Sequence, residues 1–132
     1  MKKNGILNSE ISKVLSDLGH KDQIVIADAG LPIPAGVKKI DLALAFSEPT
    51  FIRVLEEVMK DMKVEKVLLA EEIQEKNALQ LGAIDNKLVD GEEVEFVSHE
   101  AFKEQTKQAK AIIRTGEATP FSNIILQSGV LF

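Results

Sequence analysis

Residues 24–27 read Ile24-Val25-Ile26-Ala27, a short and mostly β-branched run that is apolar at consecutive positions. A strand with one face in water would alternate apolar and polar residues, so this run predicts a strand covered on both faces. Such strands are typical of parallel sheets with helices on each side. The next segment, residues 28–36, begins with Asp28 and contains two prolines and two glycines, which predicts a loop with a restricted backbone.

Helix signals flank this run on both sides. Asn8 and Ser9 are good N-cap residues, and apolar residues follow them at the i, i+3, i+4 and i+7 spacing of an amphipathic helix. We expect Gly19 to end this helix in the left-handed conformation, which leaves His20 just past its C-terminus. Pro49 suits the first turn of a second helix. Its expected buried stripe is Phe51, Val54, Leu55 and Val58.

The remaining segments continue the alternation. We expect helices over residues 71–88 and, with Ser98 as the N-cap, over residues 99–108. Further strands are expected at residues 40–45, 64–70, 94–97, 111–115 and 123–127. This order predicts a single domain over residues 1–132, of the α/β class, with three α/β/α layers and a mostly parallel, mixed central sheet of about six strands.

Composition excludes several kinds of site. The chain has no cysteine, so it forms no disulfide, thiolate nucleophile or cysteine-bound zinc site, and two histidines are few for any metal site. The net charge of −5 argues against nucleic acid as a partner, because a phosphate-binding face needs clustered lysine and arginine. Neither a dinucleotide nor a nucleoside triphosphate motif occurs. With no signal peptide or apolar membrane span in the sequence, we expect a cytoplasmic protein that uses no cofactor and no metal.

The region around His20 and Asp28 is the first candidate site. A histidine after a helix end and a carboxylate at the end of a buried strand form a plausible acid/base pair near neutral pH. Open α/β sheets also place their ligand crevices at the carboxyl ends of strands. Each residue has a structural alternative: His20 can interact with the helix dipole, and Asp28 can start an Asx turn.

A second group of candidates lies toward the C-terminus. His99 begins a helix, where a neutral imidazole can act as a hydrogen-bonding group or can simply face solvent. Phe121, Ser122 and Asn123 precede the last strand, and an aromatic face, a hydroxyl and an amide suit a polyol such as a sugar. The alternative is an apolar loop anchor followed by turn-forming residues.

Taken together, these stretches resemble the D-ribose pyranase and L-fucose mutarotase family over nearly the whole chain. The matching blocks keep one order and spacing: Gly5–Ser9, Leu18–His20, Asp28–Pro34, Lys39–Leu42, Val64–Val67, Ser98–Glu100, Phe102–Lys103, Ile113–Glu117, Asn123–Leu126 and Gly129–Val130. The loop Ala29-Gly30-Leu31-Pro32 is similar to the ribose branch, since the fucose branch tends to have a histidine and a phenylalanine before its proline. One departure is Phe121, where the family usually has a tyrosine.

The resemblance implies a cofactor-free isomerase that interconverts the β-pyranose and β-furanose forms of ribose and supplies furanose for catabolism. It implies His20 as the proton donor. The sugar-contacting residues it implies are Asp28, His99, Phe121, Ser122 and Asn123. Because the chain lacks tyrosine altogether, a phenolic hydroxyl is not essential to its chemistry.

The resemblance also implies a homo-oligomer, a decamer of two stacked pentameric rings, with sites near subunit boundaries. The apolar C-terminus Val130-Leu131-Phe132 agrees with a docked terminus. Two alternatives remain open: a mutarotase that exchanges α and β anomers of fucose or another sugar, and a non-catalytic sugar-binding accessory of ribose transport.

Overall fold

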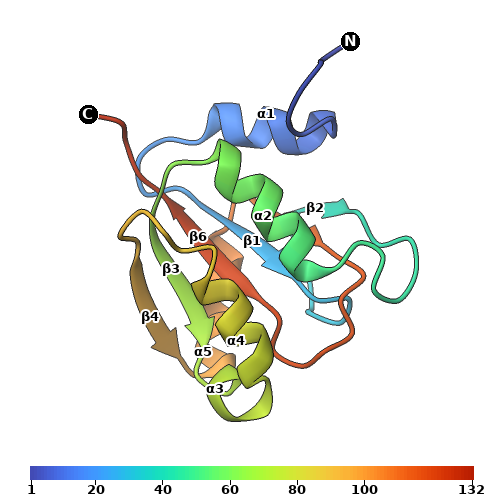
Figure 1. Cartoon of the computed structure of the whole chain (residues 1–132), viewed down its shortest axis with the longest axis vertical. Coiled ribbons are helices and arrows are strands. Elements are labelled where there is room, and N and C mark those ends of the chain that lie inside the picture. Colours follow the sequence, from blue (N-terminus) through green and yellow to red (C-terminus); the bar gives the residue numbers. More distant parts are fainter.

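The computed structural model describes all residues, 1–132, and contains one six-stranded sheet in the order β2-β5-β1-β6-β3-β4 (Figure 1). The strands are β1 (Gln23–Ala27), β2 (Lys38–Asp41), β3 (Val64–Ala70), β4 (Glu93–Val97), β5 (Ala111–Arg114) and β6 (Ile124–Ser128). β1 and β2 each pair in parallel with β5, and β3 pairs in parallel with β4, whereas β6 runs antiparallel to β1 and β3. The carboxyl ends of all strands except β6 therefore share one edge of the sheet with the start of β6. We call this the carboxyl edge, and the opposite one the amino edge.

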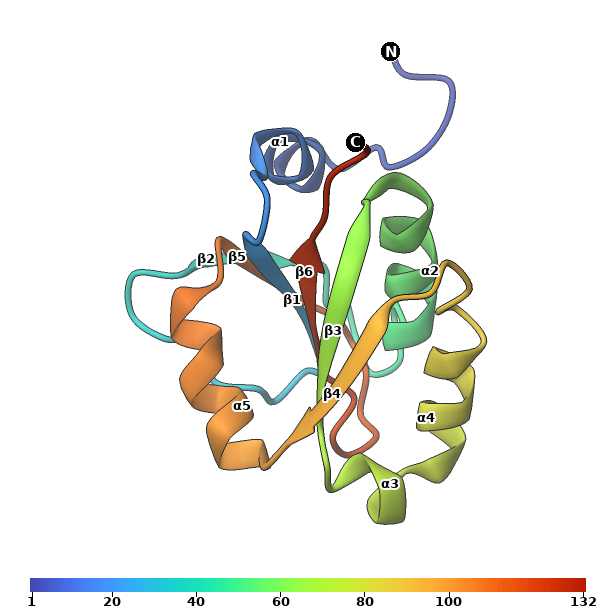
Figure 2. The ribbon, with the colours of Figure 1, turned by 90° about the vertical axis from the view of Figure 1, so that its left-hand side faces the viewer.

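Helices cover both faces of the sheet, which gives the expected three layers (Figure 2). The helices are α1 (Ser9–Asp17), α2 (Phe51–Asp61), α3 (Ile73–Lys76), α4 (Ala78–Asp85) and α5 (His99–Gln105), followed by a 3-10 turn over Thr106–Gln108. In Figure 2, α5 lies on one side of the sheet and α2 and α4 lie on the other. None of these helices is long and apolar enough to cross a membrane.

Residues 24–27 contribute to the hydrophobic cores on both faces of the sheet, because successive side chains of a strand point to opposite faces. Ile24 and Ile26 belong to the larger core, which includes Phe51 of α2. Val25 and Ala27 belong to the smaller core, which includes Phe102 of α5. All four residues of the run are fully buried, as its uninterrupted apolar pattern predicts.

Most predicted elements are confirmed. β3 has the expected bounds, Asn8 caps α1 by accepting a hydrogen bond from the backbone N–H of Ile11 at 2.9 Å, and Ser98 caps α5 in the same way through Ala101 at 3.1 Å. The stripe of α2 is buried as expected at Phe51, Val54, Leu55 and Val58.

Other expectations are wrong in detail. α1 ends at Asp17 with Leu18 extended, and the positive φ expected at Gly19 occurs instead at Lys21, with φ 73°. Here the Gly19 N–H donates to Asp22 Oδ2 at 2.8 Å, so a side chain forms the turn that glycine was expected to make.

The strand expected at residues 40–45 also ends early, at Asp41, because Ala45 forms a bridge with Glu48 in a loop of its own. The helix starting at Pro49 begins two residues later, with Thr50 as its N-cap. The helix expected over 71–88 is divided into α3 and α4 at Asn77, whose side chain caps α4 by accepting from the N–H of Gln80.

Candidate active site

The carboxyl edge brings together most of the candidate residues. Asp28 follows β1 directly, His99 begins α5 just after β4, and Asn123 immediately precedes β6. These segments are far apart in sequence, yet the strand order places β1 and β6 side by side. The expected position of Asp28, at the carboxyl end of a buried strand, is confirmed.

Asp28 and Asn123 form a reciprocal pair. The Asp28 backbone N–H donates to Asn123 Oδ1 at 2.8 Å, and Asn123 Nδ2 donates to Asp28 Oδ2 at 3.0 Å. Asp28 Oδ1 also accepts the N–H of Gly30 at 2.9 Å, so the Asx turn is present as well. Asn123 is fully buried, whereas Asp28 is half-buried. A carboxylate fixed on one side in this way keeps its remaining lone pairs for a ligand hydroxyl.

His99 and Phe121 supply an aromatic wall at the same edge. The two rings meet edge to face with centroids 5.1 Å apart, and His99 also stacks against Phe102 at 6.4 Å. Phe121 holds a positive φ of 57°, and the backbone N–H of Asn123 donates to its carbonyl at 2.9 Å. His99 Nδ1 is buried without a hydrogen-bond partner. A neutral ring with its proton on Nε2 avoids burying an unpaired donor, which leaves Nε2–H as the ring's accessible donor.

The Ser122 hydroxyl is used within the protein rather than offered to a ligand. Ser122 is fully buried, and its Oγ lies within hydrogen-bond distance of Thr119 Oγ1 (2.8 Å), Gln80 Nε2 (3.0 Å) and Asn77 Nδ2 (3.3 Å). The expectation that this hydroxyl bonds a polyol is therefore not met within the chain. Its contacts instead fix the loop that carries Phe121.

His20 lies at the amino edge, away from this group. It precedes β1, and its Nε2 is 3.0 Å from Glu65 Oε2 near the start of β3. A five-residue strand such as β1 is about 17 Å long, so it separates His20 from Asp28 at its other end. The acid/base pair expected from the sequence is consequently not formed within one chain.

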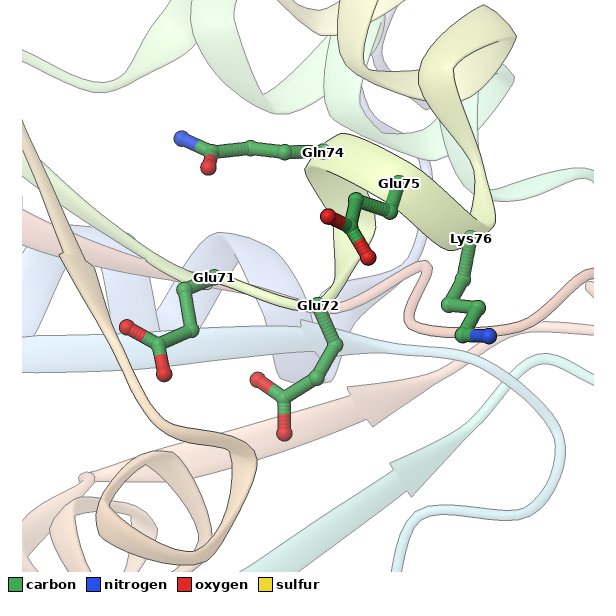
Figure 3. Close-up of a pocket in the computed structure, with 5 residues that line it drawn as sticks. All are labelled: Glu71, Glu72, Gln74, Glu75 and Lys76. Atoms are coloured by element: carbon green, nitrogen blue, oxygen red, sulfur yellow. The ribbon is translucent and has the colours of Figure 1, made fainter.

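A hollow beside Glu72 has a mostly acidic lining (Figure 3). It has a volume of about 320 Å³ and is lined by Glu71, Glu72, Gln74, Glu75 and Lys76. Both oxygens of Glu72 accept the backbone N–H of His99, at 3.0 and 3.1 Å. Glu72 thus helps to fix the start of α5, and no hydrophobic or aromatic side chain lines the hollow to cover the C–H face of a sugar.

Four polar residues that sequence reasoning did not single out support the two edges. Arg114 Nε donates to the carbonyl of Ala29, and its Nη1 contacts Asp41 Oδ2 at 3.1 Å. The backbone N–H of Ala43, and then Arg114, hold the pKa of Asp41 below its usual range. Glu117 is buried and accepts the N–H of Phe51 at 3.1 Å, at the start of α2.

Glu65 is the fourth of these residues, and it bonds both His20 and Gln127. The bond from Gln127, and then that from His20, lower the pKa of its carboxyl group. In the sequence Glu65 is one of 21 acidic residues, and nothing local distinguishes it.

The sequence and the fold are both similar to those of known proteins. A family model described as the RbsD / FucU transport protein family matches residues 1–131. D-ribose pyranase from Bacillus cereus (strain 03BB102) is 60% identical over 132 residues, and D-ribose pyranase from Bacillus thuringiensis (strain Al Hakam) is 59% identical, with full coverage of both chains in each case.

Solved structures agree with these matches. The structure of Bacillus subtilis RbsD complexed with D-ribose is similar with a TM-score of 0.96 and 54% identity, and the match covers both chains completely. The fucose mutarotase from Streptococcus pneumoniae in complex with L-fucose is similar with a TM-score of 0.80 and 25% identity, over 96% of this chain and 95% of that one.

Proposed function

The chain belongs to the RbsD / FucU transport protein family, and we propose that it is a D-ribose pyranase, an isomerase that interconverts β-D-ribopyranose and β-D-ribofuranose. The observation that carries this proposal is the full-length 60% identity to D-ribose pyranases, together with a TM-score of 0.96 to a structure complexed with D-ribose. The residues at the carboxyl edge fit a sugar, because they combine a fixed carboxylate with an aromatic wall.

The reaction needs only proton transfer and positioning. Ring opening requires a proton delivered to the ring oxygen and another removed from the anomeric hydroxyl, and closure then uses a different hydroxyl. His20 is the proposed proton donor, and general acid/base catalysis of this kind contributes about 10²–10⁴-fold. No redox step or organic cofactor enters this scheme.

The proposed sugar contacts lie at the carboxyl edge. Asp28, oriented by Asn123, would accept hydrogen bonds from sugar hydroxyls, and His99 would donate one from Nε2. Phe121 would cover C–H surface of the ring. Ser122 would act by holding the loop that presents Phe121, since its own hydroxyl is bonded to the protein.

The scheme requires two copies of the chain, since His20 and Asp28 lie at opposite edges of the sheet. A contact in which the amino edge of one subunit meets the carboxyl edge of the next is head-to-tail, and such contacts form a ring when the rotation between subunits closes. This supports the homo-oligomer implied by the family resemblance, a decamer of two stacked pentameric rings. Two exposed apolar side chains in the loop after β2, Leu44 and Phe46, each 83% exposed, suit a subunit contact.

We also propose that the enzyme acts in the cytoplasm, where it would supply furanose to a sugar kinase that consumes it. The acidic composition is compatible with this location.

Saturation-transfer NMR on ribose tests the proposed activity directly. The protein should accelerate pyranose–furanose exchange over buffer, and His20→Ala should remove most of that acceleration while ribose still binds. Absence of enhanced exchange for the wild-type protein would refute the proposal.

The same experiment separates the two alternatives. Faster α/β exchange on fucose than on ribose would indicate a mutarotase of the kind represented by the Streptococcus pneumoniae structure. Calorimetric binding of ribose without exchange would indicate a transport accessory.

A further inference from the structure

The contact between His20 and Glu65 determines which nitrogen of the imidazole carries a proton. Nε2 lies 3.0 Å from Glu65 Oε2, whereas Nδ1 makes no hydrogen bond within the chain. The pKa of Glu65 is lowered, so this group is a carboxylate at neutral pH and can only accept. Nε2 is therefore the protonated nitrogen, and Nδ1 of the neutral ring has a free lone pair.

A row of glutamines fixes the carboxylate from behind. Gln105 Nε2 donates to Gln23 Oε1 at 2.9 Å, Gln23 Nε2 donates to Gln127 Oε1 at 3.1 Å, and Gln127 Nε2 donates to Glu65 Oε1 at 2.8 Å. Every amide in this row donates toward Glu65. An anion at the end of the row suits this direction, because Gln23 and Gln127 each accept one hydrogen bond and donate one toward Glu65.

We propose that Glu65 is a positioning residue for the isomerase reaction, and that it makes Nδ1 the atom of His20 that exchanges protons with the sugar. This inference rests on the proposed function. In the proposed reaction, Nδ1 takes a proton from one sugar hydroxyl. The protonated imidazole then delivers a proton to the ring oxygen of the sugar, so the imidazole returns to its starting form. The His20 side chain is 46% exposed, which leaves Nδ1 free to reach a sugar bound by the neighbouring subunit.

The variant Glu65→Gln tests the assignment because the glutamine row dictates how the new amide must lie. Gln127 still donates to the carbonyl oxygen of the new amide, so the NH₂ group of that amide faces His20 Nε2. Nε2 must then accept, and the neutral imidazole moves its proton to Nδ1. We expect kcat for ribose exchange to fall about tenfold to a hundredfold, part of the ~10²–10⁴-fold acid/base contribution, with little change in KM.

Exchanging the carboxylate and the amide between positions 65 and 127 should reverse the effect of Glu65→Gln. In the double variant Glu65→Gln, Gln127→Glu, the new carboxylate accepts the NH₂ of the amide at position 65, so the carbonyl oxygen of that amide again faces His20. The carboxylate at position 127 also accepts from Gln23 Nε2, which already donates at that position. We expect this swap to restore the Nε2–H tautomer and most of kcat.

The direct measurement is a two-bond ¹H–¹⁵N correlation spectrum recorded at alkaline pH, which distinguishes the two imidazole tautomers. The chain has only two histidines, so His20→Ala assigns both signals and His99 serves as an internal reference for correct folding. As a matched control, Glu95→Gln neutralises a carboxylate paired with Lys66 at 2.6 Å and should change neither tautomer nor kcat.

Support requires inversion of the His20 tautomer and loss of kcat in Glu65→Gln, with both restored by the swap. If Glu65→Gln keeps the Nε2–H tautomer or wild-type kcat, or if the swap restores neither, the inference is wrong. This result is separate from failure of the proposed function, in which the wild-type protein itself accelerates no exchange.

Discussion

The two edges of the sheet present their polar groups in opposite ways. At the carboxyl edge Asp28 and Asn123 satisfy one another, and Asn123 is fully buried. At the amino edge the side chains of His20 and Glu65 are 46% and 34% exposed. Buried, mutually bonded groups suit recognition of a fixed shape, whereas an exposed imidazole suits proton exchange with a partner. The difference indicates that one chain contains two half-sites, which are completed when copies meet head to tail.

Subunit mixing should give the largest effect. His20→Ala and Asp28→Asn are each expected to lose most exchange activity, up to the ~10²–10⁴-fold of the acid/base contribution for the first. If each site takes His20 from one copy and Asp28 from the next, refolding equal amounts together should restore about one quarter of wild-type activity by random assembly. Saturation-transfer NMR on the mixture measures this.

The control for mixing is each variant refolded alone, which should remain inactive. Recovery requires subunits of both kinds in one particle, so a mixture that stays inactive although mass spectrometry finds mixed particles would contradict a shared site.

Substitutions at the two ends of β6 should sharpen the contrast in burial. Asn123→Leu removes the only side chain that bonds both the N–H and the carboxylate of Asp28, and an unpaired buried polar group costs about 1–3 kcal/mol. Gln127 lies at the other end of the same strand and is half-buried, and Gln127→Met removes its hydrogen bonds, each worth about 0.5–1.5 kcal/mol. Urea denaturation should show the larger loss of unfolding free energy for Asn123→Leu, and equal losses would remove the distinction between the edges.

The sequence predicts the carboxyl edge far better than the amino edge. The uninterrupted apolar pattern of residues 24–27 predicts a central strand, and Asp28 must then lie at its end. Parallel strands place other carboxyl ends at the same edge, whereas Asn123 lies beside Asp28 because β6 runs antiparallel to β1 and begins at this edge. Strand order is not encoded locally, however, and the contact between His20 and Glu65 depends on β6 lying between β1 and β3.

Local sequence signals also mislead where a side chain, rather than the expected backbone conformation, forms a turn or ends a helix. Asp22 forms the turn assigned to Gly19, and Asn77 divides a segment that reads as one helix. Gly116 shows the converse, because a Cβ there would clash with the carbonyl oxygen of Ala45. Only the folded loop after β2 reveals that requirement.

Phe121→Tyr should have a smaller effect and probes the aromatic wall of the carboxyl edge. The ring is half-buried and meets His99 edge to face, so an added hydroxyl should change the unfolding free energy by no more than about 0.5 kcal/mol. If the hydroxyl bonds the sugar, a net hydrogen bond of about 0.5–1.5 kcal/mol should lower the Kd for ribose about twofold to twelvefold. Calorimetry measures this change, and an unchanged Kd would place the ring edge away from the sugar hydroxyls.

The smallest effect concerns the pH dependence contributed by Glu65 at the amino edge. Its pKa is lowered in the folded protein, chiefly by the bond from Gln127 and then by His20, so the folded state favours the ionised form. That stabilisation is fully present above the ordinary glutamate pKa and is lost as pH falls through the lowered one. The difference in unfolding free energy between wild type and Glu65→Gln should therefore shrink as the solution is acidified below the ordinary pKa. Glu95 makes no bond to His20, so Glu95→Gln serves as the control. If the difference in unfolding free energy between wild type and Glu65→Gln stays constant with pH, the Glu65 carboxylate gains no stability from Gln127 and His20.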